Sequence, residues 1–165
     1  MHRLQAAIQL TQGKVEVCNG QNAGAPGITE HHHAAEKCFL QGMSIAHADF
    51  ELQQRLQAEL SFVQGEIGLR SADLIHALKS FNAGVDTKHG DQGLTARLNM
   101  GRQYTEGKKL AADGRHGEAI QYFVQALRVE HGDRDLVRRL RLDLKSSARI
   151  HEGCSECEIP QMPSV

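Results

Sequence analysis

Two groups of residues in this 165-residue chain carry side chains that could bind a metal ion or take part in redox chemistry. The first group is the run His31, His32 and His33, which lies between Glu30 and Glu36. Imidazole and carboxylate groups are common ligands of zinc and iron. Three neighbouring residues of one helix point in different directions, however, and cannot all reach one ion. The run therefore favours exposed histidines over a metal site.

The same region contains carboxylate-x-x-His pairs, the spacing that di-metal helical bundles use. These pairs are Glu30 with His33 and Asp73 with His76. Such a centre also needs a carboxylate from each of two further helices, and no helical stripe supplies them. The pairs alone do not predict a di-metal centre.

The second group lies near the C-terminus and consists of His151, Cys154 and Cys157. A Cys-x-x-Cys pair is half of a zinc site or a redox pair. The chain has no second pair, because Cys18 and Cys38 stand alone. The sequence therefore favours an inert tail here. A small helical metal-binding or redox protein that uses His31–His33 or Cys154 and Cys157 is the alternative function.

The sequence has no motif that supplies catalytic machinery. It lacks a G-x-x-x-x-G-K phosphate loop, a G-x-S-x-G elbow and an H-E-x-x-H zinc motif. We therefore expect a protein that is not an enzyme and carries no cofactor. The net charge of −1 favours neither an acidic nor a basic partner, although residues 101–150 carry eleven Lys and Arg against seven Asp and Glu.

The composition is that of a helical globular protein. Hydrophobic residues make up 40%, charged residues 24% and aromatic residues 4%, and helix-forming residues dominate the middle and the C-terminal part. Four cysteines are too few for a disulfide scaffold, so we expect reduced thiols and a cytoplasmic location. No apolar run approaches the ~18–20 residues of a membrane span, so no membrane partner is expected.

The pattern along the chain predicts three regions: a flexible N-terminal segment at 1–30, a helical domain at 31–150 and a flexible tail at 151–165. The first region contains the Gly-, Asn- and Pro-rich stretch CNGQNAGAPGITE. A break is predicted near Asp49, before a helix with a stripe of Leu52, Leu56, Leu60, Val63 and Ile67. Further helices are predicted from a cap at Ser71 to about Phe81, and at about 92–113, 115–131 and 134–150. No strand pair stands out, so the predicted class is all-α, in antiparallel hairpins.

The stretch from Glu106 to Leu127 has small and large residues at fixed offsets. They are Gly107, Leu110, Gly114, Ala119, Phe123 and Ala126. This pattern resembles the tetratricopeptide repeat, a helix-turn-helix unit of 34 residues that would run here from about Met100 to Asp133. The sequence departs from the family at Gln103, where a Trp-like residue is usual, and at His131, where proline is usual.

One such repeat cannot bury its own faces and needs stacking partners. Upstream, Gly65, Ala77, Phe81 and Gly84 partly reproduce the spacing at an offset of 42 residues. Downstream, an apolar stripe predicts a helix that caps the stack; it consists of Leu136, Val137, Leu140, Leu144 and Ala148. The predicted architecture is a short stack resembling tetratricopeptide repeats with irregular N-terminal hairpins, and an irregular helical bundle is the alternative.

The resemblance implies a protein–protein interaction adaptor or an assembly subunit that docks a peptide segment in a helical-repeat groove. The face that the family uses would here include Tyr104, Lys108 and Ala111, followed by Arg138, Leu142 and Lys145. One aromatic ring and several cations suit an acidic peptide segment or a C-terminal carboxylate. The chain lacks the Lys-and-Asn carboxylate clamp of chaperone-binding members, because Tyr104 and Lys108 occupy those positions.

The last predicted helix carries a basic stripe of Arg134, Arg138, Arg141, Lys145 and Arg149. Such a stripe can follow an acidic protein surface or a phosphate backbone. More often it keeps an end-capping helix soluble. Because no aromatic residues alternate with these charges and no readout motif is present, nucleic acid is not the expected partner.

Overall fold

The computed structural model describes residues 2–22, 25–46, 49–129 and 134–153. These residues contain seven helices and no strand, which confirms the predicted all-α class. The helices are α1 (His2–Asn22), α2 (Ala25–Ile45), α3 (Phe50–Arg70), α4 (Leu74–Asp86), α5 (Gln92–Ala112), α6 (His116–Leu127) and α7 (Arg134–Glu152). None of these described helices is long and apolar enough to cross a membrane.

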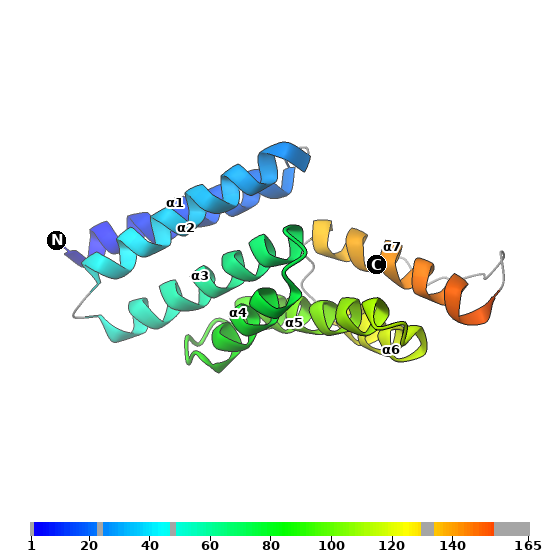
Figure 1. The fold of residues 1–165 in the computed structure, drawn as a ribbon. Coiled ribbons are helices and arrows are strands. Elements are labelled where there is room, and N and C mark those ends of the chain that lie inside the picture. The colour runs from blue at the N-terminus through cyan, green and yellow to red at the C-terminus, as the bar shows by residue number, and fades with distance from the viewer. Residues whose placement is uncertain (1, 23–24, 47–48, 130–133, 154–165) are drawn as a thin grey trace.

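The helices pack as neighbouring pairs in the order of the chain (Figure 1). Three hairpins form, from α1 and α2, from α3 and α4, and from α5 and α6. The second helix of each hairpin contacts the helix that follows it, so that α7 packs on α6 and ends the described stack. The odd-numbered helices also contact one another in sequence. This arrangement is compatible with a helical-repeat fold.

The sequence repeats with a period of 42 residues, and this period matches the succession of hairpins. Asp49 and Asp91 stand 42 residues apart, and each caps its helix: the carboxylate of Asp49 accepts the backbone N–H of Leu52, and that of Asp91 accepts the N–H of Leu94, both at 3.0 Å. Further residues recur with the same period: Leu52, Leu94 and Leu136; Arg55, Arg97 and Arg139; Leu56, Leu98 and Leu140; Ala77 and Ala119. Helices α3, α5 and α7 are therefore equivalent first helices, and α4 and α6 are equivalent second helices.

In each hairpin, a glycine of the first helix packs against a phenylalanine of the second helix. A side-chain carbon at that glycine would overlap the ring, so only glycine lets the two backbones approach this closely. The added Cβ would lie 2.3 Å from a ring atom for Gly13 and Phe39, 2.5 Å for Gly65 and Phe81, and 2.4 Å for Gly107 and Phe123. The glycine precedes the phenylalanine by 26 residues in the first hairpin and by 16 in the other two. In the first hairpin, the helical segments between this contact and the turn are therefore longer than in the other two hairpins.

The expectation of a flexible segment at 1–30 is wrong for its described part. Residues 2–22 form α1, and residues 25–30 belong to α2. Ala6, Val17 and Ile28 are buried. Gly20, one of the glycines that suggested a loop, lies where α1 packs on α2: a Cβ there would lie 3.2 Å from Cβ of His31 on the facing helix. Of the tail predicted at 151–165, residues 154–165 lie outside the described part.

The predicted break near Asp49 is confirmed, whereas the predicted cap of the next helix is wrong. Asp73 caps α4 by accepting the backbone N–H of His76, and Ser71 instead ends α3, where its hydroxyl donates to the Ile67 carbonyl. Helix α4 also continues past its predicted end to Asp86. Gly84 lies inside it as a packing residue, because a Cβ there would lie 2.5 Å from a methyl group of Leu98 in α5.

Candidate functional site

Two of the residues predicted to line a partner groove, Tyr104 and Lys108, face α7. Only 2% of Tyr104 is exposed, and its hydroxyl donates to Oδ2 of Asp143 at 2.7 Å. Burial, followed by the hydrogen bond to Asp143, raises the pKa of Tyr104 above its ordinary value, so the hydroxyl remains a donor. Nζ of Lys108 lies 3.3 Å from the same Asp143 oxygen. Both side chains therefore join α5 to α7 within the chain.

A cluster of buried and half-buried charges fills the region next to Tyr104. The guanidinium of Arg139 in α7 lies 2.5 Å from Glu66 of α3 and 5.8 Å from the centre of the Tyr104 ring. Arg70 of α3 pairs with Asp135 of α7 at 2.8 Å. A peptide that contacted the Tyr104 ring directly would have to displace these interactions, and burial makes that displacement costly.

A second buried ionic cluster joins the first helices of the three hairpins. Glu59 of α3 is fully buried and lies 2.9 Å from Nζ of Lys14 in α1 and 3.2 Å from the guanidinium of Arg97 in α5. Arg97 also lies 4.7 Å from the centre of the Phe62 ring. The recurrence of Arg55, Arg97 and Arg139 every 42 residues is the sequence signal that indicates these clusters.

His32 lies near Arg70 and Arg139 of the charged cluster next to Tyr104. Its protonation is expected to make the stability of the fold depend on pH. Burial, followed by the positive charges of Arg70 and Arg139, lowers the pKa of His32 to about 4. The unfolded chain binds this proton near the ordinary pKa of 6.5, so stability should fall as the pH drops through that range.

Between about pH 7.5 and about pH 5, we expect His32 to account for a loss of about 2 kcal/mol in the free energy of unfolding. Urea unfolding of the wild type and of His32→Gln at both pH values measures this loss. The glutamine variant should lose less stability on acidification, whereas His33→Gln, at an exposed position, should behave as the wild type. An equal loss for wild type and His32→Gln would contradict the assignment.

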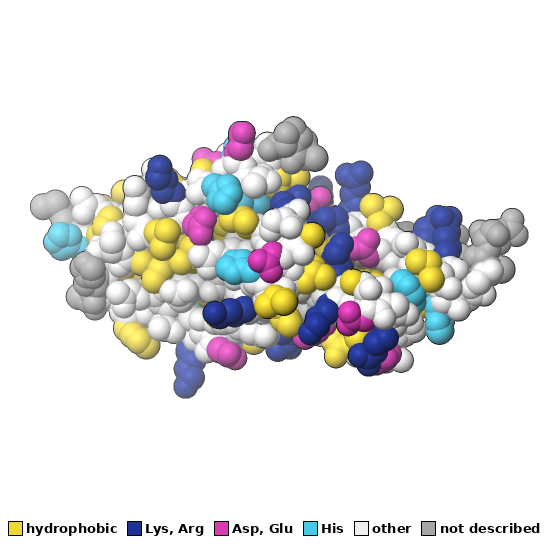
Figure 2. Space-filling view, viewed as in Figure 1, with side chains coloured by type: hydrophobic (Ala, Val, Ile, Leu, Met, Phe, Trp, Pro, Cys, Tyr) yellow, Lys and Arg dark blue, Asp and Glu magenta, His cyan; other side chains and the backbone are white. Residues whose placement is uncertain are grey.

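The other predicted partner-binding residues, Arg138, Arg141 and Lys145, lie exposed on α7. Figure 2 shows that Lys and Arg side chains gather over the half of the molecule that holds α7. Within the described residues, none of these three cations has an ion pair. Leu142 lies among them with 59% of its surface exposed.

This face of α7 is equivalent to the face on which α3 and α5 receive their second helices. In α5, Met100 is two turns from Gly107 and so shares the face that meets Phe123. The 42-residue period places Leu142 and Arg149 at the positions of Met100 and Gly107. Met100 is fully buried, whereas no helix among the described residues covers Leu142. Helix α7 is therefore a first helix without a described second helix.

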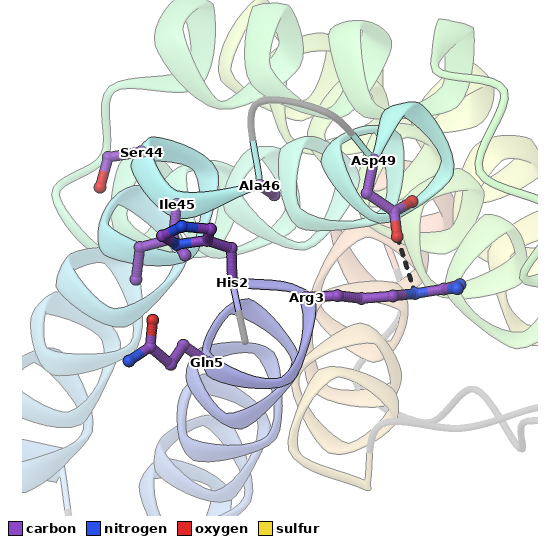
Figure 3. A pocket seen from close by; sticks show the side chains of 7 residues that line it. All are labelled: His2, Arg3, Gln5, Ser44, Ile45, Ala46 and Asp49. Atoms are coloured by element: carbon purple, nitrogen blue, oxygen red, sulfur yellow. Dashed lines mark ion pairs between the residues drawn. The ribbon is translucent and has the colours of Figure 1, made fainter.

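A hollow of about 570 Å³ lies at the other end of the stack, between the start of α1 and the end of α2 (Figure 3). Its walls consist of His2, Arg3, Gln5, Ser44, Ile45, Ala46 and Asp49. The only charged pair drawn there, Arg3 and Asp49, is an ion pair of 2.8 Å. The hydroxyl of Ser44 in this lining donates to the backbone carbonyl of Gln41 at 2.7 Å.

The three consecutive histidines diverge, as the sequence predicts, but the expectation that they are exposed is wrong for His32, which is only 2% exposed. Nδ1 of His31 lies 2.7 Å from Glu16 in α1, His32 points into the protein, and His33 lies 3.4 Å from Glu36 on the surface. No group of three potential metal ligands occurs within the described residues. Cys154 and Cys157 lie outside that part of the chain.

Comparison of the chain with protein-family models, with curated proteins and with solved structures gives no match.

Proposed function

We propose that this protein is a non-enzymatic adaptor or assembly subunit, built from tetratricopeptide-like hairpins, that binds a protein partner. Two observations support the repeat assignment. The third hairpin carries the small and aromatic residues of that family at matching offsets, and the 42-residue period extends part of the pattern to the second hairpin. Proteins of this architecture stack hairpins to create extended surfaces for other proteins.

We place the docking surface on the exposed face of α7, which consists of Arg138, Arg141, Leu142 and Lys145. The observation that carries this assignment is the 59% exposure of Leu142 at a position that is buried in α3 and α5. An acidic segment with an apolar side chain could cover Leu142 while its carboxylates meet the surrounding cations. Tyr104 and Lys108 would hold α7 in place through Asp143 instead of contacting the partner.

The test is affinity capture from a nuclease-treated lysate of the source cell, followed by mass spectrometry. The variant Arg138→Glu/Arg141→Glu/Lys145→Glu reverses the surface charge. The control Lys37→Glu/Lys79→Glu/Lys88→Glu makes the same charge change at exposed positions on α2, α4 and the following loop. We expect a partner that wild type and control retain, that the α7 variant loses and that high salt elutes. Equal capture by all three chains would reject this surface.

A further inference from the structure

Helix α1 carries an exposed apolar stripe on its outer side. Leu4 is 68% exposed, Ile8 46% and Val15 52%, and the exposed residue Thr11 lies between the last two. The steps between these residues are four, three and four, so all four lie along one side of the helix with the spacing of a coiled-coil seam. The uncovered surface thus runs along most of α1.

The equivalent face of every later first helix is covered. Leu56 in α3 contacts α2 at Gly42, where an added Cβ would lie 2.9 Å from the leucine, and Leu98 in α5 makes the same contact with Gly84 in α4. Alignment on the glycines Gly13 and Gly65 places Leu4 at the position of Leu56. The positions of Ile8, Thr11 and Val15 correspond to Leu60, Val63 and Ile67, which continue the stripe of Leu56 in α3 and lie in or against the hydrophobic core. This surface of α1 therefore corresponds to the face by which α3 and α5 pack against a preceding helix, but no described helix covers it in α1.

The charges around this stripe favour a second copy of the same chain. Arg3 pairs with Asp49, Lys14 with Glu59, and Glu16 with His31, so the charged side chains of α1 are held by their own chain. On one side the stripe is flanked by the uncharged polar residues Gln5, Gln12 and Asn19, and on the other side by the paired cations Arg3 and Lys14. Two such faces can meet without bringing like charges together. The cationic face of α7 is a poor match for this neutral stripe.

We infer that two copies of this chain associate through their α1 helices, packed antiparallel about a two-fold axis. In antiparallel packing with this spacing, the axis passes between Ile8 and Thr11. Leu4 of one copy then lies opposite Val15 of the other copy. The association leaves the cationic face of each α7 exposed, so the dimer would present two docking surfaces.

Sedimentation equilibrium of the full chain over a range of concentrations tests this inference. The wild type should dimerise, and Ile8→Glu should raise the dimer dissociation constant at least about tenfold, because two carboxylates would enter the interface. Ile75→Glu is the matched control, since it makes the same change at an 81% exposed position on α4 and should leave the constant unchanged. Far-UV circular dichroism checks that both variants are folded. A monomeric wild type, or equal constants for wild type and Ile8→Glu, would overturn the inference.

A double variant tests the antiparallel direction. Leu4→Lys and Val15→Glu should each weaken dimerisation of the chain. In the double variant Leu4→Lys/Val15→Glu, antiparallel packing brings the introduced lysine of each copy opposite the introduced glutamate of the other copy, so the double variant should dimerise more tightly than either single variant. Parallel packing would instead bring lysine opposite lysine and glutamate opposite glutamate. A double variant that dimerises no more tightly than the single variants would therefore reject the antiparallel arrangement.

Discussion

Replacement of Phe81 by alanine is expected to lower the free energy of unfolding by about 3–5 kcal/mol. The Phe81 ring is fully buried between two glycines, Gly65 of α3 and Gly101 of α5, and an added Cβ on either would lie 2.5 Å from it. The ring also packs edge-on against Phe62, with centroids 6.2 Å apart. Its removal would leave a cavity between three helices, and the glycines have no side chains that could move into it.

Urea unfolding followed by circular dichroism measures this effect. Ile75→Ala on the same helix is the control: it removes a large apolar side chain that is 81% exposed, and it should change the free energy of unfolding by no more than about 0.5 kcal/mol. Equal effects of Phe81→Ala and Ile75→Ala would show that α4 is not packed between α3 and α5 as described.

The C-terminal half of the fold is predictable because its signals are local. Gly107 and Phe123 belong to adjacent helices of ordinary length, and the tight turn at Gly114, with φ of 77°, separates them. The stripe of leucines in α7 likewise has helical spacing that a short window detects. These features place the helices at 92–113, 115–131 and 134–150 close to their positions in the structure.

The first hairpin is not predictable in this way, because its helices depend on contacts between distant residues. Gly13 and Gly20 weaken α1 as an isolated helix. Both glycines lie where α2 comes close, and Phe39, which packs on Gly13, is 26 residues further along the chain. From the local sequence alone, the two glycines predict a loop. In the folded chain they instead allow α1 and α2 to pack closely.

The candidate site is likewise only partly predictable from the sequence. Helical spacing is sufficient to place Arg138, Arg141 and Lys145 together on an exposed face. The surroundings of Tyr104 depend instead on Asp143, which lies 39 residues away and accepts its hydroxyl hydrogen bond. A search for residues repeated every 42 positions would have indicated that Arg97 and Arg139 belong to the stack itself.

Removal of the buried carboxylate of Glu59 should destabilise the fold strongly. Glu59 lies between Lys14 and Arg97 and so links α1, α3 and α5. Glu59→Leu replaces the carboxylate by an apolar side chain of similar size. It leaves Lys14 and Arg97 near each other without their shared counter-ion. Loss of one partner of a buried ion pair typically costs about 3–5 kcal/mol, and we expect an effect of this size in urea unfolding.

Two further variants separate this effect from a general loss of acidic residues. Glu118→Leu removes a carboxylate from an ion pair with Arg115 in which both side chains are more than half exposed, and stability should stay close to that of the wild type. The double variant Glu59→Leu/Arg97→Met should regain part of the stability that Glu59→Leu loses, because it also removes the arginine left without its partner. If Glu59→Leu alone had no greater effect than Glu118→Leu, the buried ion pairs would not be what holds the three first helices together.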